Sequence, residues 1–380
     1  MKPMGPANPV DEELVEEPRP SRSWHSGRGH AMRLLSPCKL LGRYLAALRV
    51  GCLAILLAGP MEVMAANELV VYSARKEELI RPAIQAAEKA LGLKVTLFTA
   101  GAGELARRIE LEKASPRGDV FIGTTAGFAE LMRDRGLLDG FTSPLLKEIP
   151  AEFRSPDNTW VPISARVRVL VYNTNLLKPQ EVPGSIFDLT DPKWKGKVVV
   201  ASMGERTTVG WLAAILAVKG EDFTRRYVAD LKANGLKVLK NNTEVRKAVA
   251  NGEYPVGVTN HYYYLLQLQA DPQSPLGIRY PDQAPADMGT PVFSITAALI
   301  KGTRNAEAGR SFLEFLLKPE GNRHLVEGEF EIPLIPGLHL PGADKGIKGL
   351  GQFKRPALTQ AQIAELEPKV ERLFGSALTP

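Results

Sequence analysis

Cysteine is nearly absent from this chain of 380 residues. Only Cys38 and Cys52 occur, and both lie within the first 66 residues, so the rest of the sequence has no thiol. This excludes a disulfide framework, a cysteine-ligated metal site and a thiol nucleophile from the main part of the protein. An oxidising compartment therefore poses no hazard to that part.

Signatures of catalysis and of nucleic-acid binding are also missing. The sequence has no Gly-x-Ser-x-Gly, His-Glu-x-x-His or P-loop motif. After residue 66 only His261, His324 and His339 remain as histidines, so side chains for a nucleophile–base pair are scarce. The formal net charge is +6, without a run of Lys and Arg interleaved with aromatics. We therefore expect neither an enzyme nor a nucleic-acid-binding protein.

No apolar run is long enough to cross a membrane, which takes about 20 residues. The strongest run, Val50–Gly59, is shorter, and the small residues Ala65 and Ala66 follow it. Four basic residues precede it: Arg33, Lys39, Arg43 and Arg49. A basic region, a short apolar run and small residues at the exit are typical of a secretory signal peptide.

We expect cleavage after Ala65 or Ala66 and export to the periplasm. Met32 is the more natural start of such a signal. Lipidation is not expected, because the apolar run follows Cys52 instead of preceding it, and Arg49 stands where a lipidation motif needs an aliphatic residue. Residues 1–66 are thus predicted to be an N-terminal extension and signal peptide.

From residue 67 onward, short apolar strands alternate with amphipathic helices. The strand Glu68–Tyr72 precedes the helix Glu77–Leu91, whose apolar residues recur at near-helical spacing and which Gly92 ends. Two more strand–helix pairs follow: Lys94–Phe98 with Glu104–Lys113, and Asp119–Gly123 with Gly127–Arg135. This βαβαβα order predicts a parallel sheet with helices on both faces.

A second unit of the same kind follows. Its predicted strands are Lys197–Ala201, Leu236–Leu239 and Tyr254–Val258, and its predicted helices are Val209–Lys219, Glu221–Asn234 and Thr243–Asn251. Two long β-rich segments, Ile163–Asn173 and Pro291–Ile300, can cross between the units. We predict an α/β fold of two doubly wound domains joined by a two-strand hinge, which usually closes around a ligand. The first domain is assigned to residues 67–168 and 292–335, and the second to 169–291 and 336–380.

Three consecutive tyrosines, Tyr262, Tyr263 and Tyr264, follow a predicted strand at the start of a helix. Successive helical residues are about 100° apart, so one helical face cannot bury all three rings. Two adjacent phenols can instead point into a cleft at the strand end, where open α/β sheets bind ligands. A phenolate suits a hard cation such as Fe³⁺. Aromatic packing at a domain edge is the alternative, and the polar neighbours Asn260 and His261 favour a site.

Short motifs throughout residues 67–380 carry a likeness to a known family. They are Val70–Arg75, Asp119–Phe121, Thr125–Ala129, Ser164–Arg166, Val171–Tyr172, Asp191–Gly196, Asn251–Glu253, Asn260–Tyr263 and Glu331–Leu334. On these motifs the chain resembles the periplasmic ferric-ion-binding proteins, which are substrate receptors of ABC importers. The resemblance implies a type II periplasmic-binding-protein fold and a cleft that holds Fe³⁺ with a synergistic anion, carbonate or phosphate. The expected partners are an inner-membrane ABC permease and its ATPase, and we expect the receptor to be a monomer.

The tyrosine pair of that family falls on Tyr262 and Tyr263, so these are the predicted Fe³⁺ ligands, and Tyr264 is expected to pack. Positions that match the family's anion-binding groups are Ser202, Gly204, Asn242, Asn260 and Arg166. The first two precede a predicted helix, whose N-terminal amides attract anions. For Arg166, a salt bridge at the hinge is an equal alternative.

The chain departs from the family at two positions. Where many relatives place a histidine ligand after the first strand, this chain has Arg75, and the turn Ile122–Thr125 lacks the glutamate of many relatives. Glu205 and His261 lie near the motifs and could substitute for the two missing ligands, but we expect both to face solvent. Arg75 or Arg166 is then expected to hold the anion and to help the phenolates form, since the pKa of free tyrosine is near 10.

The same arginines and polar groups could serve a second ligand class. Without a metal they would suit a phosphonate or another organic anion, and related receptors carry such cargo on this fold. A fold does not fix a ligand. An organic-anion receptor is therefore the alternative function.

Overall fold

The computed structural model describes residues 67–380, so the predicted signal peptide, cleavage site and absence of a lipid anchor fall outside the described residues. The strands of a first sheet are β1 (Asn67–Ser73), β2 (Leu93–Thr99), β3 (Val120–Gly123), β4 (Leu138–Asp139), β5 (Val161–Asn173) and β10 (Val292–Ile300). Their order is β2-β1-β3-β10-β5, with β4 paired to β10. The three strands of the predicted parallel sheet, β1, β2 and β3, are parallel as expected. Strand β10 then enters antiparallel between β3 and β5.

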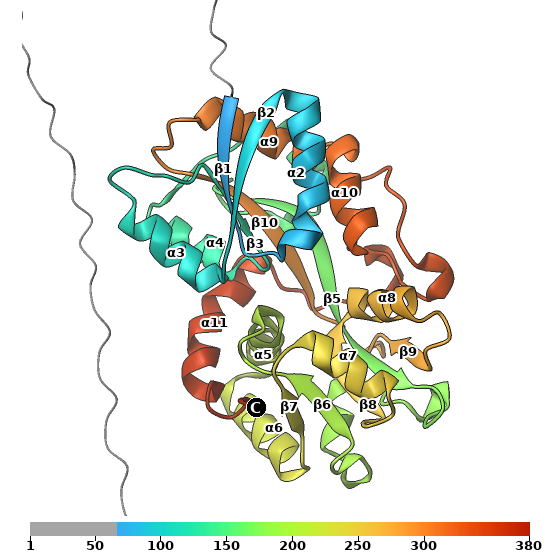
Figure 1. Ribbon diagram of the computed structural model, residues 1–380. Helices are drawn as coiled ribbons and strands as arrows, with labels where there is room; N and C mark the ends of the chain where they lie inside the picture. The colour runs from blue at the N-terminus through green and yellow to red at the C-terminus, as the bar shows by residue number, and fades with distance from the viewer. Residues whose placement is uncertain (1–66) are drawn as a thin grey trace, which may run out of the picture. The chain divides into compact units, whose positions relative to one another are not determined.

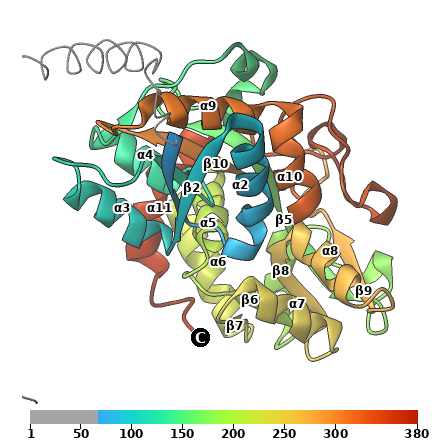
Figure 2. The same ribbon diagram turned by 45° about the horizontal axis from the view of Figure 1, so that its top comes forward.

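Helices cover both faces of this sheet. They are α2 (Glu77–Leu91), α3 (Ala102–Leu111), α4 (Gly127–Asp134), α9 (Ala306–Leu317) and α10 (Pro319–Glu329). Successive strand residues point to opposite faces. Val71 accordingly packs in one core with Ile80 of α2 and Phe312 of α9, whereas Tyr72 packs in another with Leu105 of α3. Figure 2 shows α10 beside α2, with which it is in contact.

The second sheet has the order β5-β8-β6-β7, with β9 also paired to β5. Its further strands are β6 (Val198–Ala201), β7 (Lys237–Leu239), β8 (Val256–Asn260) and β9 (Leu276–Arg279), and its helices are α5 (Arg206–Lys219), α6 (Glu221–Ala233), α7 (Asn242–Ala250) and α8 (His261–Ala270). Val200 packs in one core with Trp211 of α5. Val199 packs in the other with Val245 of α7, so both faces are again covered.

Gly257 in β8 allows α7 to lie unusually close to the strand. A Cβ atom at this position would be 2.8 Å from the Val245 side chain and 2.9 Å from that of Val249. Real Cβ atoms do not approach so closely, so a larger residue would push α7 away. The close packing brings Asn242, at the start of α7, beside the end of β8: its Oδ1 accepts a hydrogen bond from the Thr259 hydroxyl at 3.0 Å.

Strand β5 belongs to both sheets (Figure 1). Its residues up to Val167 pair with β10, and its residues from Arg168 pair with β8. The helix α11 (Gln360–Phe374) packs against both α4 and α5. The division into domains at residues 168 and 169, 291 and 292, and 335 and 336 stays a prediction.

Candidate functional site

A cleft of about 670 Å³ gathers the starts of helices from both sheets. Its walls are formed by the beginnings of α2, α3 and α4 beside the first sheet and of α5, α7 and α8 beside the second. Charged and phenolic side chains on these walls include Arg166, Glu205, Arg246, Tyr262 and Tyr263. Helix N-termini carry unpaired amides and a partial positive charge, so the cleft favours anionic ligands.

Tyr262 and Tyr263 lie side by side in the first turn of α8, directly after β8. Their ring centroids are 4.2 Å apart, with the planes inclined by 32°. Both line the cleft, although only 5% and 6% of their surfaces are exposed. Burial raises the pKa of both phenols. Without a bound cation, both are therefore neutral at physiological pH.

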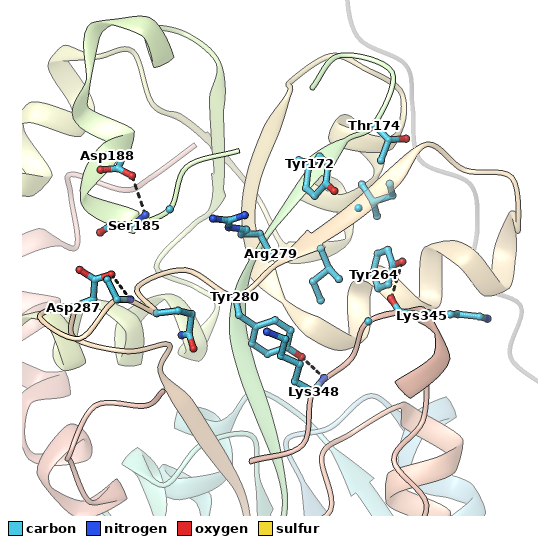
Figure 3. A pocket seen from close by; sticks show the side chains of 17 residues that line it. Tyr172, Thr174, Ser185, Asp188, Tyr264, Arg279, Tyr280, Asp287, Lys345 and Lys348 are labelled. Carbon is cyan, nitrogen blue, oxygen red and sulfur yellow. Dashed lines mark hydrogen bonds between the residues drawn. The ribbon is translucent and has the colours of Figure 1, made fainter. Parts of the chain in front are cut away.

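Tyr264 turns away from the cleft into the core, as predicted for a packing residue. Its hydroxyl donates a hydrogen bond to the Lys345 carbonyl at 3.1 Å. It lines a different pocket, of about 860 Å³, which does not include Tyr262 or Tyr263 (Figure 3). Figure 3 shows acidic Asp188 and Asp287 on one side of that pocket and Lys345 and Lys348 on the other. Tyr172 and Tyr280 also line this pocket, but neither neighbours Tyr264 in the sequence, and the charges around them are mixed.

Arg166 lies on the cleft wall with its guanidinium 4.8 Å from the ring centroid of Tyr262. Its Nε donates to Glu331 at 2.9 Å. Glu331 also accepts from Arg75 at 2.7 Å and from the Ser164 hydroxyl. Burial alone would raise the pKa of Glu331, but these two arginines outweigh it and hold the pKa well below its usual range. The salt bridge considered for Arg166 is thus present, and the same side chain still reaches the cleft.

Arg75 also lines the cleft, but two carboxylates hold it. It forms ion pairs with Glu329 and Glu331, and its side chain is buried. Because both carboxylates already neutralise its charge, Arg75 is less available to bind an anion from solution. The turn after β1 thus carries a structural ion-pair cluster.

The other predicted anion-binding residues divide between the cleft wall and the layer behind it. Gly204 lines the cleft, and its N–H donates to Ser202 Oγ at 3.3 Å. Ser202 is buried and donates to the Lys240 carbonyl at 2.9 Å. Asn242 and Asn260 are also buried, and neither belongs to the lining.

Arg168 connects these asparagines and was not predicted. Its Nη1 donates to Asn242 Oδ1 at 2.9 Å and to Asn260 Oδ1 at 3.3 Å, and its Nη2 donates to Thr208 Oγ1 at 3.0 Å. These three acceptors stand at the starts of α7, α8 and α5. Among residues 67–380 no carboxylate lies within ion-pair distance of Arg168, and burial lowers its pKa to about 10. A charged residue within the apolar run of β5 was the available sequence signal.

Two further polar residues face the cleft. Glu205 lines it, and its Oε1 accepts a hydrogen bond from the Asn242 N–H at 3.2 Å. Arg246 of α7 also lines it, and its Nε and Nη1 have no hydrogen-bond partner among the described residues. The sequence predicted a solvent-facing role for Glu205, with a substitute metal ligand as the alternative. Arg246 was missed because nothing in the pattern of α7 distinguishes it.

His261 does not face solvent, so that prediction is wrong. The ring is fully buried, with Nδ1 accepting from the Val167 N–H at 3.1 Å and Nε2 lying 2.8 Å from the Phe330 carbonyl. Since Nδ1 accepts, Nε2 carries the proton and donates to the carbonyl. Burial lowers the pKa of His261 to about 4, which keeps the ring neutral. Its two ring nitrogens are occupied by the backbone, which leaves no lone pair for a metal.

The described part of the chain offers no conventional metal cluster. Between residues 67 and 380, no three His, Cys, Asp or Glu side chains are grouped so that they could hold a metal ion. A metal in the cleft would therefore depend on the phenols of Tyr262 and Tyr263. No helix in the same range is both long and apolar enough to span a bilayer.

The chain is similar to known bacterial solute-binding and iron-binding proteins. The family model of the bacterial extracellular solute-binding proteins matches residues 115–357. Iron uptake protein A2 of Synechocystis is 31% identical over 291 residues, which cover 74% of this chain and 83% of that protein. Iron-bound HitA from Pseudomonas aeruginosa superposes with a TM-score of 0.75 at 26% identity, over 81% of this chain and 99% of that one.

A second solved structure leads to the same family. A Trichodesmium protein (IdiA, FutA) in complex with iron and citrate ligands has a TM-score of 0.73 at 28% identity, over 82% of this chain and 99% of that one. The fold is that of a type II periplasmic binding protein, as expected. The chain belongs to the bacterial extracellular solute-binding proteins and, within them, to the family of periplasmic ferric-ion-binding proteins.

Proposed function

We propose that the protein is a periplasmic receptor that binds Fe³⁺ in the cleft and delivers it to an ABC importer. The observation that carries the proposal is the pair of phenols of Tyr262 and Tyr263, which lie with ring centroids 4.2 Å apart on the cleft wall. Relatives whose names specify iron support it. The expected partners are an inner-membrane ABC permease and its ATPase, and the receptor itself is expected to be monomeric and without catalytic activity.

The surrounding charges suit a tyrosine-ligated cation. Each phenol must lose its proton to bind Fe³⁺, and burial opposes that loss. The trivalent ion supplies most of the compensation, and the Arg166 guanidinium beside the Tyr262 ring supplies more. Binding therefore releases protons.

An oxyanion completes the coordination of the metal in this proposal. If it is taken from solution, carbonate or phosphate fits the donors best: Arg166, the amide of Gly204, and the polar groups of Ser202, Asn242 and Asn260 behind it. Arg75 contributes through Glu331, which it shares with Arg166. An organic-anion receptor is less well supported, because such cargo gives no role to two adjacent buried phenols.

The visible spectrum tests the proposal. Protein purified from iron-replete cells should be coloured by charge transfer from tyrosinate to Fe³⁺, and a strong chelator should remove the colour. Colourless protein that binds no added Fe³⁺, with or without carbonate, would contradict it.

A further inference from the structure

Glu205 stands where an anion from solution would be expected. It is the N-cap residue of α5, and its side chain makes no capping hydrogen bond to that helix. Instead its Oε1 accepts from the amide of Asn242, the first residue of α7, at 3.2 Å. The carboxylate thus uses a helix-terminal amide of the kind that binds anions. It does so on the wall that also carries Tyr262 and Tyr263.

Several buried polar atoms around Glu205 have no hydrogen-bond partner within residues 67–380. Among the described residues, Arg168 Nε, Thr207 Oγ1 and Asn242 Nδ2 are buried without a partner. Buried polar groups are normally paired, so these three indicate a ligand or a rearranged side chain. Thr207 lines the cleft itself. Arg168 and Asn242 lie in the buried layer behind the wall, so of the three it is Thr207 that stands on the cleft wall, where a carboxylate or another oxyanion can reach it.

Charge also favours a carboxylate at this end. Arg168 is fully buried, and no carboxylate among the described residues forms an ion pair with it. Burial lowers the pKa of Arg168, and the negative charge of Glu205 partly opposes that shift. Two other carboxylates line the cleft, Glu78 and Glu371. Glu371 is engaged by Arg206, and Glu78 is exposed on α2. Glu205 is therefore the carboxylate best placed beside the phenols.

We propose that Glu205 fills the anion position from within the chain, so that Fe³⁺ is held by Tyr262, Tyr263 and Glu205 without carbonate or phosphate. This inference rests on the proposed function and changes only the source of the anion. A tethered ligand loses little translational freedom on binding, so it outcompetes a dilute ion from solution. Its negative charge also repels a second anion. With two phenolates and one carboxylate, the charge of Fe³⁺ is balanced.

The test compares Fe³⁺ affinity with and without added anion. Wild type, Glu205→Ala and Glu205→Gln are titrated against one competing chelator, in buffer freed of carbonate and phosphate and again with either added. The Fe³⁺ affinity of wild type should change by less than about 3-fold when carbonate or phosphate is added. In buffer without either anion, both variants should bind Fe³⁺ about 100-fold or more weakly than wild type. Glu205→Ala should regain at least about 10-fold when either anion is added, because the position is then open.

The matched control is Glu244→Gln. Glu244 lies in the first turn of α7 and accepts from the Lys240 amide, but it does not line the cleft. This variant should behave as wild type, and circular dichroism should show every variant folded. Wild-type binding that requires carbonate or phosphate, or unchanged affinity in both Glu205 variants, would overturn the inference and leave the proposed function standing. No Fe³⁺ binding by wild type under any condition would overturn both.

Discussion

The guanidinium of Arg166 is anchored to Glu331 at 2.9 Å and lies 4.8 Å from the ring centroid of Tyr262. One side chain thus joins the buried ion-pair cluster to the proposed metal ligands. An anchored cation at this distance stabilises the phenolate form of Tyr262 over the phenol.

Replacing Arg166 should weaken iron binding. We expect Arg166→Met to lower Fe³⁺ affinity by about 10- to 100-fold and to shift the charge-transfer band, because the cation beside the phenolate is lost. The matched control is Arg108→Met, which removes a guanidinium 4.8 Å from the Tyr72 ring centroid, outside the cleft. Equal effects of the two substitutions in a chelator titration would count against a specific role for Arg166.

His261 should make the protein sensitive to acid. Its folded pKa, about 4, lies below the usual value of about 6.5, so the neutral ring contributes stability above pH 6.5 that is lost as the pH falls towards 4. The loss amounts to roughly 3 kcal/mol. His261→Gln keeps an acceptor and a donor but does not titrate. Urea unfolding of this variant should show a shallower decline of stability between pH 6.5 and 4.

Exposed His339 provides the comparison for that experiment. The free energy of unfolding of His339→Gln should decline as the pH falls, in the same way as that of wild type. If His261→Gln also follows the wild-type curve, charging of the buried ring does not limit stability in acid.

Ligand binding should make the protein more compact. Strand β5 passes from one sheet to the other between Val167 and Arg168, and we expect the chain to bend there. Small-angle scattering should give a smaller radius of gyration with Fe³⁺ than without it. Superimposable profiles would argue against hinge closure, while leaving the ligand assignment open.

Export should remove the N-terminal segment. The basic and apolar residues up to Ala66 predict a mature chain that begins at Ala66 or Asn67. Mass spectrometry of the soluble exported protein should find that terminus and no attached lipid. Exported protein that retains residues before Gly59 would show that this segment is not a cleaved signal.

Strong local patterns allowed most of the fold to be predicted. The bounds of α2 agree with the sequence prediction, because this helix shows a clear apolar stripe. The helix α10 (Pro319–Glu329) was missed because its apolar residues are sparse and it contains Gly321 and Gly328; packing against α2 and α9 supports it instead. The strand β9 (Leu276–Arg279) was also missed, because Gly277 weakens its strand pattern, and pairing with β5 supports it instead.

The site was less predictable, because it depends on contacts between distant residues. The tyrosine pair is a local signal, and both rings lie in the cleft. The surroundings of His261 are not local: its two partners are Val167 on β5 and Phe330 after α10. Arg168 likewise gathers side chains from three helices that are separate in the sequence.

Equilibrium titration of Fe³⁺ against a competing chelator, followed by visible absorption, tests the central claim most directly. Tyr262→Phe and Tyr263→Phe each remove one oxygen and keep the ring, so packing is nearly conserved. Each should lower Fe³⁺ affinity by about 100-fold or more and shift or abolish the charge-transfer band. Tyr264→Phe loses only its hydrogen bond to Lys345 and should bind as wild type. Wild-type affinity and colour in both Tyr262→Phe and Tyr263→Phe would contradict the account.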